Sequence, residues 1–512
     1  MTSNYTDIIV GCGSAGAALT LRLSGDPTRR LLVIEAGPDL VGRQVPDTIR
    51  YGREMSFADH DWDFRAEAVD GRRVRFPRGK LTGGSSAVGA TIGLRGMPRD
   101  YDEWAALGNE GWAWADVLPY FRKLERDLDF SDEWHGSDGP VPIRRFADEE
   151  LSPLQSSFTA ACIDRGFPDV KDHNNPTATG VGSIPSTRLD AQHRFTTAIG
   201  YLAPARQRAN VTVVADSFAR RLILEHGRTV GVEMERAGGT ETVRADRVIV
   251  AAGSVATPLL LMRSGIGPRA ELARLGIDVV VDLPGVGANL IDHPRTGAFM
   301  VADASVWDRS MPFLQTILRT TSTGSTELND MQYYMINYFD LRYFPELQML
   351  SGAPVIGGVM VCGQRPKSRG RLTLTSADPA ERPLIDLNFL SDERDLSTLR
   401  EGVRLAWDLL NSDQLAPHMQ RPLIVHDAMI ENDEILDVYL RSSVDSAYHP
   451  VGTARMGPAD DQNAVVDSRG AVYGVDGLYV CDASIMPNIP SANTNLTSIM
   501  IGEKMSDHFL GM

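Results

Sequence analysis

The sequence of 512 residues is poor in cysteine, with only four. Cys12, Cys162, Cys362 and Cys481 are scattered and show no CxxC spacing, so the pattern predicts neither a disulfide framework nor a structural zinc site. Internal repeats and low-complexity linkers are also lacking, which favours compact domains packed against one another. We expect a reducing compartment.

Positive charge is scarce as well. The net charge is −16 and the pI about 5.1, which argues against a nucleic acid partner, because binding to phosphates needs clustered Lys and Arg. The N-terminus shows no basic segment followed by a cleavage site. The apolar stretch 248–262 is interrupted by Gly253 and Pro258 and is too short for a bilayer. We expect a cytoplasmic protein without membrane insertion.

The N-terminal residues follow the pattern of a βαβ unit. Residues 7–10 predict a buried strand, residues 15–23 a helix of small and leucine residues, and residues 31–34 a second strand. A later strand within 243–253 runs into a glycine turn, and 477–484 repeats that pattern. Strands so far apart in the sequence predict one sheet built from several segments.

The fold class expected is therefore α/β, with a discontinuous Rossmann-like nucleotide-binding domain. We assign residues 1–150, 195–298 and 441–512 to this domain. Residues 151–194 and 299–440 lack glycine-rich phosphate turns and are assigned to a sheet-and-helix substrate-binding domain. The second of these segments carries an aromatic run of Tyr333, Tyr334, Tyr338, Phe339, Tyr343 and Phe344.

A glycine motif follows the first strand and opens the first helix. Gly11 permits a tight turn, Gly13 lets the backbone approach a pyrophosphate, and Gly16 lets helix and strand pack closely. The helix N-terminus offers unpaired N–H groups to phosphate. Glu35 ends the second strand, where its carboxylate can accept both ribose hydroxyls. The alternative is a plain strand–helix turn, and the unit alone does not separate FAD from NAD.

Five longer segments carry a resemblance that does separate them. They are Pro77–Glu125 ("PRGKLTGGSSAVGATIG…"), Gly253–Gly267 ("GSVATPLLLMRSGIG"), Leu283–Pro294 ("LPGVGANLIDHP"), Tyr448–Gly457 ("YHPVGTARMG") and Cys481–Lys504 ("CDASIMPNIPSANTNLTSIMIGEK"). In their content and order they resemble the glucose-methanol-choline (GMC) oxidoreductases over nearly the whole chain.

The resemblance implies FAD as the cofactor and a Rossmann-like FAD-binding domain. Trp62 corresponds to a tryptophan near the adenine end, with a plain core anchor as its alternative. Asp482 corresponds to a strand-terminal acid near the cofactor's sugar-alcohol chain or phosphates, with a capping role as its alternative. The implied cofactor-binding residues are Gly11, Gly13, Ser14, Ala15, Glu35, Ala36, Trp62, Gly84, Ser85, Gly89, Ala219, Asp482, Ala483, Thr494 and Asn495.

Two positions depart from the family pattern, and a third bears on how the flavin is held. Thr82 stands where an aliphatic residue is usual, and Gly89 where Asn or His is usual, so a flavin contact at Gly89 would be through backbone or absent. We align Ala87 with the position that carries a His–flavin bond in some relatives, and therefore expect noncovalent FAD.

Alcohol oxidation requires a base at the hydroxyl and a hydride acceptor at the carbon. Histidine suits the first task, because its neutral imidazole is available near neutral pH. The resemblance places this base at His449 and a second hydrogen-bonding side chain at Asn493, which cannot act as an equivalent base. The alternatives are a core histidine for His449 and an Asx-turn for Asn493. No histidine spacing indicates a metal site.

We expect the enzyme to oxidise an alcohol, preferentially a primary alcohol, to the aldehyde. O2 or another electron acceptor is expected as the second partner. The aromatic run favours an aromatic alcohol, although the same residues are equally explained as core. An NAD-dependent dehydrogenase leaves the later motifs unexplained. An FAD-containing lyase of the hydroxynitrile lyase type is the alternative on the same fold, and a nonenzymatic FAD-binding protein is a third, disfavoured because His449 and Asn493 are both present.

Overall fold

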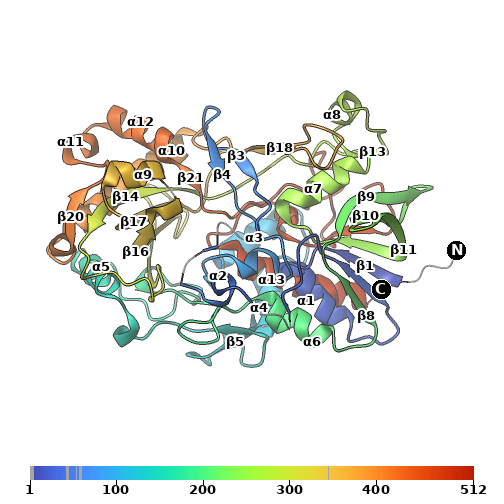
Figure 1. The fold of residues 1–512 in the computed structure, drawn as a ribbon, viewed down its shortest axis with the longest axis horizontal. Coiled ribbons are helices and arrows are strands. Elements are labelled where there is room, and N and C mark those ends of the chain that lie inside the picture. Colours follow the sequence, from blue (N-terminus) through green and yellow to red (C-terminus); the bar gives the residue numbers. More distant parts are fainter. Residues whose placement is uncertain (1–4, 42–44, 54, 57–59, 344, 512) are drawn as a thin grey trace.

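Two seven-stranded sheets organise the chain in a computed structural model, which describes residues 5–511 except 42–44, 54, 57–59 and 344. In Figure 1 the sheet around β1 (Tyr5–Val10) lies at one end of the molecule, and the sheet around β16 (Met331–Asp340) lies at the other. The mixed α/β class expected from the sequence is confirmed.

The first sheet is the nucleotide-binding sheet. Its order is β8 (Val211–Val214), β2 (Leu31–Ile34), β1, β11 (Gly239–Val250), β10 (Arg228–Arg236) and β9 (Phe218–Glu225), and β22 (Leu478–Val480) pairs with β11. β8, β2, β1, β11 and β22 pair in parallel. Helix α1 (Ser14–Leu23) packs against α13 (Thr494–Leu510), although 470 residues of sequence separate them. The C-terminal helix is thus tied to the first βαβ unit.

The turn after β1 depends on glycine. Gly11 has a φ of +101°, and a Cβ there would lie 2.4 Å from the carbonyl oxygen of Ala251. A Cβ on Gly16 would lie 2.1 Å from the carbonyl oxygen of Gly11. A side chain on Gly11 would therefore collide with the backbone that follows β11, and a side chain on Gly16 would force α1 away from the turn after β1. Gly11 thus permits the tight turn and Gly16 the close packing that the motif predicted.

The second sheet is antiparallel and has two different faces. Its order is β20 (Met419–Pro422), β14 (Pro294–Ala302), β17 (Val355–Gly363), β16, β15 (Thr316–Thr320) and β7 (Gly180–Ser183), and β21 (Asp445–Ser446) pairs with β14. Because side chains alternate along a strand, Tyr333 and Met335 join the main core, where α10 (Glu393–Leu410) covers the sheet. Tyr334 and Ile336 belong to a separate apolar cluster on the opposite face. That second face is left to line a cavity.

A small sheet joins the two halves. It has the order β18 (Arg371–Thr373), β19 (Leu384–Asp386), β3 (Arg65–Glu67) and β4 (Arg73–Arg75). It therefore combines segments that the sequence assigned to different domains. Strand β14 also spans the assigned limit at 298/299, and β21, from the segment assigned to the nucleotide-binding domain, pairs with β14 in the second sheet. The domain boundaries stay a prediction.

The individual elements follow the expected pattern closely. The strand at 31–34 has the expected limits, and the strand expected within 243–253 is the second half of β11, which leads through a glycine turn into α7 (Gly253–Arg263). The other helices and strands are α2 (Asp47–Arg50), α3 (Pro98–Ala106), α4 (Trp114–Leu124), β5 (Glu125–Asp127), β6 (Val141–Ile143), α5 (Pro153–Asp164), α6 (Ala203–Ala205), β12 (Ile266–Gly267), α8 (Arg269–Arg274), β13 (Val281–Asp282), α9 (Pro345–Ser351), α11 (Asp427–Ile430) and α12 (Asp433–Ser443). Across the described ranges, every helix is too short or too polar to cross a bilayer. All four cysteines are buried with free thiols.

Candidate active site

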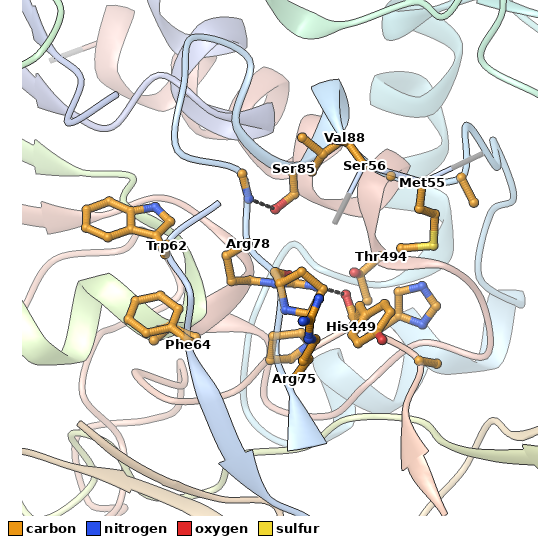
Figure 2. A pocket seen from close by; sticks show the side chains of 18 of the residues that line it. Met55, Ser56, Trp62, Phe64, Arg75, Arg78, Ser85, Val88, His449 and Thr494 are labelled. Carbon is orange, nitrogen blue, oxygen red and sulfur yellow. Dashed lines mark hydrogen bonds between the residues drawn. The ribbon is translucent and has the colours of Figure 1, made fainter. Parts of the chain in front are cut away.

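A single cavity of about 1060 Å³ runs from the end of β1 to the second sheet. In Figure 2 Trp62 and Phe64 lie at one side of it, and His449 and Thr494 at the other. Every site residue expected from the sequence lines this cavity, namely Gly11, Gly13, Ser14, Ala15, Glu35, Ala36, Trp62, Gly84, Ser85, Gly89, Ala219, His449, Asp482, Ala483, Asn493, Thr494 and Asn495. The fold thus brings together residues from both ends of the chain.

Two glycine turns meet where the phosphate groups of a dinucleotide are expected. A Cβ on Gly84 would lie 2.8 Å from the Cα of Gly13, whereas a Cβ on Gly13 would have only the Cα of Gly84 near it, at 3.8 Å. Gly13 directly precedes α1, whose first turn presents free N–H groups and a partial positive charge. The side chain of Ser14 donates a hydrogen bond to Asn495 Oδ1 at 2.7 Å. This corner therefore joins α1 to the start of α13.

The carboxylate of Glu35 is buried at the end of β2. One oxygen accepts from Cys12 N at 3.0 Å and the other from Gly37 N at 2.9 Å. Burial raises the pKa of Glu35 to about 7, although these backbone N–H groups pull it down. Each oxygen keeps a further lone pair, so the carboxylate can still receive the two ribose hydroxyls.

Trp62 lines the cavity as part of a cluster of aromatic rings. Its indole stacks on Phe64 with ring centroids 5.7 Å apart and approaches Phe218 at 6.1 Å. Lys80 Nζ lies 4.8 Å from the centre of the indole ring. Trp62 both lines the cavity and packs against the main core, and its contact with the adenine end of the cofactor stays a prediction.

Asp482 links β22 to two helix starts. One carboxylate oxygen accepts from Gly253 N at 2.8 Å and from Thr257 Oγ1 at 2.6 Å. The other accepts from Ser484 N at 2.8 Å. Asp482 thus caps α7 and the short helix at Ala483–Ile485, so the capping alternative accounts for part of its role.

The positions that depart from the family pattern have local partners. Gly89 N donates to Ser85 O at 3.0 Å, and Gly89 O accepts from Arg194 Nη1. Ala87 is buried in a cluster with Leu81 and Val88, and only Val88 of these three lines the cavity. Thr82 Oγ1 donates to Asp39 Oδ1 at 3.2 Å. Noncovalent binding of FAD stays a prediction.

His449 and Asn493 face each other in the cavity. Asn493 Nδ2 lies 3.1 Å from His449 Nε2, and Asn493 Oδ1 accepts from Tyr334 Oη at 3.2 Å. Asn493 occupies the N-cap position of α13, yet its side chain makes no capping hydrogen bond. An asparagine there usually caps the helix, so the diversion of its amide to His449 argues against the Asx-turn alternative.

His293 lies behind His449, and its spacing in the sequence indicated no function, only a structural residue. Its Nε2 is 3.1 Å from the carbonyl oxygen of Pro490, and its Nδ1 is 3.0 Å from His449 Nδ1. A carbonyl oxygen only accepts, so Nε2 of His293 carries the hydrogen. Burial lowers the pKa of His293 to about 3. Neutral His293 therefore offers an acceptor at Nδ1, His449 donates from its own Nδ1, and the lone pair of His449 is left on Nε2.

The electrostatic surroundings keep His449 neutral. Burial is the main reason that its pKa lies well below the ordinary value, and His293, Arg78 and Arg295 lower it further. Arg78 Nη2 donates to the carbonyl oxygen of Tyr448 at 2.7 Å. Asp292 Oδ1 accepts from the backbone N of His449 at 2.9 Å. The imidazole is thus a neutral base, and its Nε2 lone pair faces the amide of Asn493 in the cavity.

The part of the cavity wall that the second sheet and the segment before β15 form is largely apolar and aromatic. Of the aromatic run, Tyr334, Tyr338 and Phe339 line the cavity, while Tyr333 packs into the main core; Phe344 lies outside the described residues. Phe299, Phe313, Leu314, Ile336 and Met360 complete this wall. The sequence could not divide the run between the two faces, because register alone decides which side chains face the cavity.

One group of potential metal ligands lies outside the cavity. Glu125, Asp127 and His135 place a ligand atom each within 4.8 Å of one another. However, Arg95 pairs with Glu125, and Arg145 pairs with Asp127 at 2.5 Å. These arginines already balance the carboxylates, so we treat the cluster as an ion-pair network.

Comparisons with known proteins agree with these features. Two family models, both described as GMC oxidoreductase, match residues 5–295 and 366–502. The oxygen-dependent choline dehydrogenase of Brucella anthropi is 37% identical over 530 residues, covering 98% of this chain and 95% of the relative. That of Sinorhizobium medicae is 38% identical over 529 residues, covering 98% and 95%.

Solved structures are similar over the whole fold. Pyridoxine 4-oxidase from Mesorbium loti superposes with a TM-score of 0.92 at 31% identity, covering 99% of this chain and 100% of that one. A formate oxidase has a TM-score of 0.90 at 25% identity, covering 99% and 98%. The glycine cradle, the free helix start and Glu35 also fit FAD. This chain belongs to the GMC oxidoreductases, as an FAD-dependent enzyme that oxidises alcohols.

Proposed function

We propose that this enzyme oxidises a primary alcohol to the aldehyde, with His449 as the base and Asn493 as the residue that holds the substrate oxygen. The observation that carries the proposal is the contact of 3.1 Å between His449 Nε2 and Asn493 Nδ2 inside the cavity. When bound, FAD supplies the hydride acceptor, N5 of its flavin ring.

His449 is arranged to take the hydroxyl proton. Its Nδ1–H is held by His293, so the lone pair on Nε2 faces the cavity. A substrate hydroxyl that replaces the amide of Asn493 as the partner of Nε2 donates its hydrogen to that lone pair. Neutral imidazole receives the proton and becomes imidazolium while the hydride leaves the carbon.

Asn493 supports the developing negative charge on the oxygen. Tyr334 Oη lies 3.2 Å from Asn493 Oδ1 and 2.5 Å from Gln332 Oε1, so these two oxygens share its single hydrogen. The Nδ2 atom of Asn493 is directed at His449. A fixed amide donor of this kind stabilises an oxyanion without reorganising during the reaction. Burial raises the phenol pKa of Tyr334 far above the ordinary value. Tyr334 therefore stays protonated and contributes hydrogen bonds, but does not act as a base.

The proposal also covers the kind of substrate and the electron acceptor. The apolar and aromatic wall supports a substrate with a nonpolar or aromatic body next to its hydroxyl carbon. The electron acceptor is O2 or another acceptor. The names of two relatives, choline dehydrogenase and pyridoxine 4-oxidase, refer to different alcohols, so they support the reaction class more than any one substrate.

An anaerobic mixing experiment tests the proposal. The FAD-loaded enzyme is mixed with primary, aromatic, sugar and amino alcohols in the absence of oxygen, and flavin absorbance is followed together with the product. At least one primary alcohol should bleach the flavin and yield one aldehyde per flavin. Admission of oxygen then separates an oxidase from a dehydrogenase. Conversion of substrate without bleaching would instead indicate a lyase and refute the proposal.

A further inference from the structure

One cationic side chain projects from the second sheet into the same cavity. Arg295 lies on β14, opposite Cys362 of β17 and next to Asp445 of β21. Its side chain is only 19% exposed, and all three of these residues line the cavity. Arg295 therefore faces the cavity rather than the outer surface of the protein.

The hydrogen bonds of Arg295 are unevenly distributed over its guanidinium. Nη2 lies 3.1 Å from Asp445 Oδ2 and donates to Tyr448 Oη at 2.8 Å. Nη1 has only the thioether sulfur of Met360, at 3.6 Å, and a thioether is a weak acceptor. A buried guanidinium usually has oxygen acceptors on both terminal nitrogens. The Nη1 side therefore lacks the strong acceptor that the Nη2 side has.

Arg295 is also close to the catalytic residues. Its Cζ lies 4.5 Å from the ring centre of Tyr448, the residue directly before His449. Its charge and that of Arg78 both act on His449 and help to lower the pKa of that imidazole, after the larger effect of burial. A ligand placed for oxidation at His449 thus lies within the electrostatic reach of Arg295.

We propose that Arg295 selects the substrate by charge, so that the cavity accepts alcohols carrying a carboxylate or another anionic acceptor group and rejects quaternary ammonium alcohols. This inference rests on the proposed function. The acceptor group of the substrate completes the hydrogen bonding of Nη1, while the apolar wall of Phe299 and Ile336 packs against the substrate body.

Asp445 does not reverse this preference. Its carboxylate is 31% exposed and already pairs with Nη2, so it balances part of the charge and leaves the Nη1 donors free. A cationic substrate would have to compete with Arg295 for Asp445 at the cost of a like-charge contact. Choline is a quaternary ammonium alcohol, so the substrate differs in charge from the one that names the choline dehydrogenases.

Two series of alcohols with matched shape test the proposal. The first is isethionate, 3,3-dimethylbutan-1-ol and choline, which share a HO–CH2–CH2 arm and carry charges of about −1, 0 and +1 at neutral pH. The second is 4-(hydroxymethyl)benzoate, benzyl alcohol and 4-(hydroxymethyl)phenyltrimethylammonium. Anaerobic stopped-flow measurement gives the flavin reduction rate constant and the apparent Kd for each. Binding is also titrated in His449→Ala, where slow reduction lets the flavin spectrum report occupancy.

The measure of preference is the flavin reduction rate constant divided by the apparent Kd. In at least one series this value should be roughly tenfold or more higher for the anion than for the cation, and the neutral alcohol should lie between them. Arg295→Gln should bring this ratio close to one, and Arg295→Glu should reverse it. Arg295→Lys should keep the preference with weaker binding, while Asp445→Asn should increase it. FAD content and Tm identify variants that fail to fold, and Asp445→Asn then provides the independent test.

Arg220→Gln provides the matched control, because Arg220 lies on β9 in exposed ion pairs outside the cavity. It should leave the ratio unchanged. Cations that bind or react as well as the anions in both series would overturn the inference, as would a ratio insensitive to Arg295→Gln. If no alcohol bleaches the flavin, the proposed function fails, and the binding titrations still decide whether the cavity prefers anions.

Discussion

His293 determines which nitrogen of His449 is available as a base. Their Nδ1 atoms lie 3.0 Å apart, and the other nitrogen of His293 is committed to the carbonyl oxygen of Pro490. Only a His449 protonated at Nδ1 satisfies both contacts, and its Nε2 then faces the cavity. His293 itself does not line the cavity. It is therefore a positioning residue that acts through the tautomer of His449.

Replacing His293 should reduce catalysis more than binding. In His293→Leu the acceptor for Nδ1–H is lost, so His449 can populate the tautomer whose Nε2 carries the hydrogen. The rate constant for flavin reduction should fall roughly tenfold to a hundredfold, part of what a general base contributes. The apparent Kd of the alcohol should change less than threefold, roughly, because His293 does not contact the substrate. Anaerobic stopped-flow measurement separates these two constants.

His293→Asn provides the conservative comparison. Its amide can present an oxygen to His449 and an N–H toward Pro490, so it should recover part of the rate that His293→Leu loses. Equal rates in the two variants, at equal FAD content and Tm, would contradict a role in tautomer selection and leave only a packing role.

The two catalytic side chains should have unequal effects. His449→Ala removes the base, and flavin reduction by the alcohol should fall by about 10² to 10⁴ with FAD still bound. Asn493→Ala removes one oxyanion donor, which typically costs about 10² to 10³, and leaves His449 in place. Solvent isotope effects on flavin reduction should persist in Asn493→Ala, where proton transfer to His449 continues. A His449→Ala variant that is reduced at the wild-type rate would refute the assignment of the base.

The pH dependence should follow Asp292 rather than His449. Burial raises the pKa of Asp292 to about 6, and its carboxylate accepts from the backbone N of His449. Ionised Asp292 stabilises the imidazolium that forms during the reaction, whereas the pKa of His449 lies well below this range. The rate of flavin reduction should therefore rise severalfold, roughly, as pH increases through 6. In Asp292→Asn this step should disappear; a step that remains would belong to another group.

The sequence predicted the elements that local pattern controls. The first βαβ unit was predictable from Gly11, Gly16 and Glu35. The glycines are required by the tight turn and the close helix packing, and the glutamate marks the end of the second buried strand. The long motifs also named His449 and Asn493, which the structure brings within 3.1 Å of each other; their catalytic roles stay a prediction. The elements of the first βαβ unit were predictable because each depends on neighbours within one segment.

Relationships across segments were not predictable in the same way. The contact between His293 and His449 joins positions 156 residues apart. They are brought together by the pairing of β14 with β21 and of Ile291 with Val451. The same holds for Arg295 and for the division of Tyr333 and Tyr334 between the core and the cavity. The one available signal was the place of His293 in the "LPGVGANLIDHP" segment, just before β14.

The two glycines of the first turn should respond differently to alanine. A Cβ at Gly11 would collide with the carbonyl oxygen of Ala251 at 2.4 Å, so Gly11→Ala should lower both Tm and FAD content. A Cβ at Gly13 meets no protein atom closer than 3.8 Å and would project where the cofactor's phosphates approach. Gly13→Ala should fold with a Tm near that of the wild-type apoprotein and bind FAD about tenfold or more weakly. Full FAD affinity in Gly13→Ala would show that the phosphates lie elsewhere.

The ion-pair network of β5 should make stability depend on pH. His135 Nδ1 lies 2.9 Å from Glu125 Oε1, and its Nε2 lies 3.1 Å from Asp172 Oδ2. Burial alone would lower the pKa of His135, but hydrogen bonds to Asp127, Asp172 and Glu125 raise it from 6.5 to about 11. Opposing burial, His135 and Arg145 lower the pKa of Asp172 from 3.8 to about 2.

The sign of the effect follows from these directions. A raised histidine pKa stabilises the fold fully below pH 6.5, and this contribution is lost as pH rises toward 11. A lowered carboxyl pKa stabilises above pH 3.8, and this contribution is lost as pH falls through 2. The free energy of unfolding should therefore fall by about 1–3 kcal/mol between pH 6.5 and 9. His135→Gln should flatten this slope whatever its absolute stability, whereas replacing the exposed His193 by Gln should leave it unchanged; equal slopes in the wild type and His135→Gln would show that His135 is neutral in the folded protein.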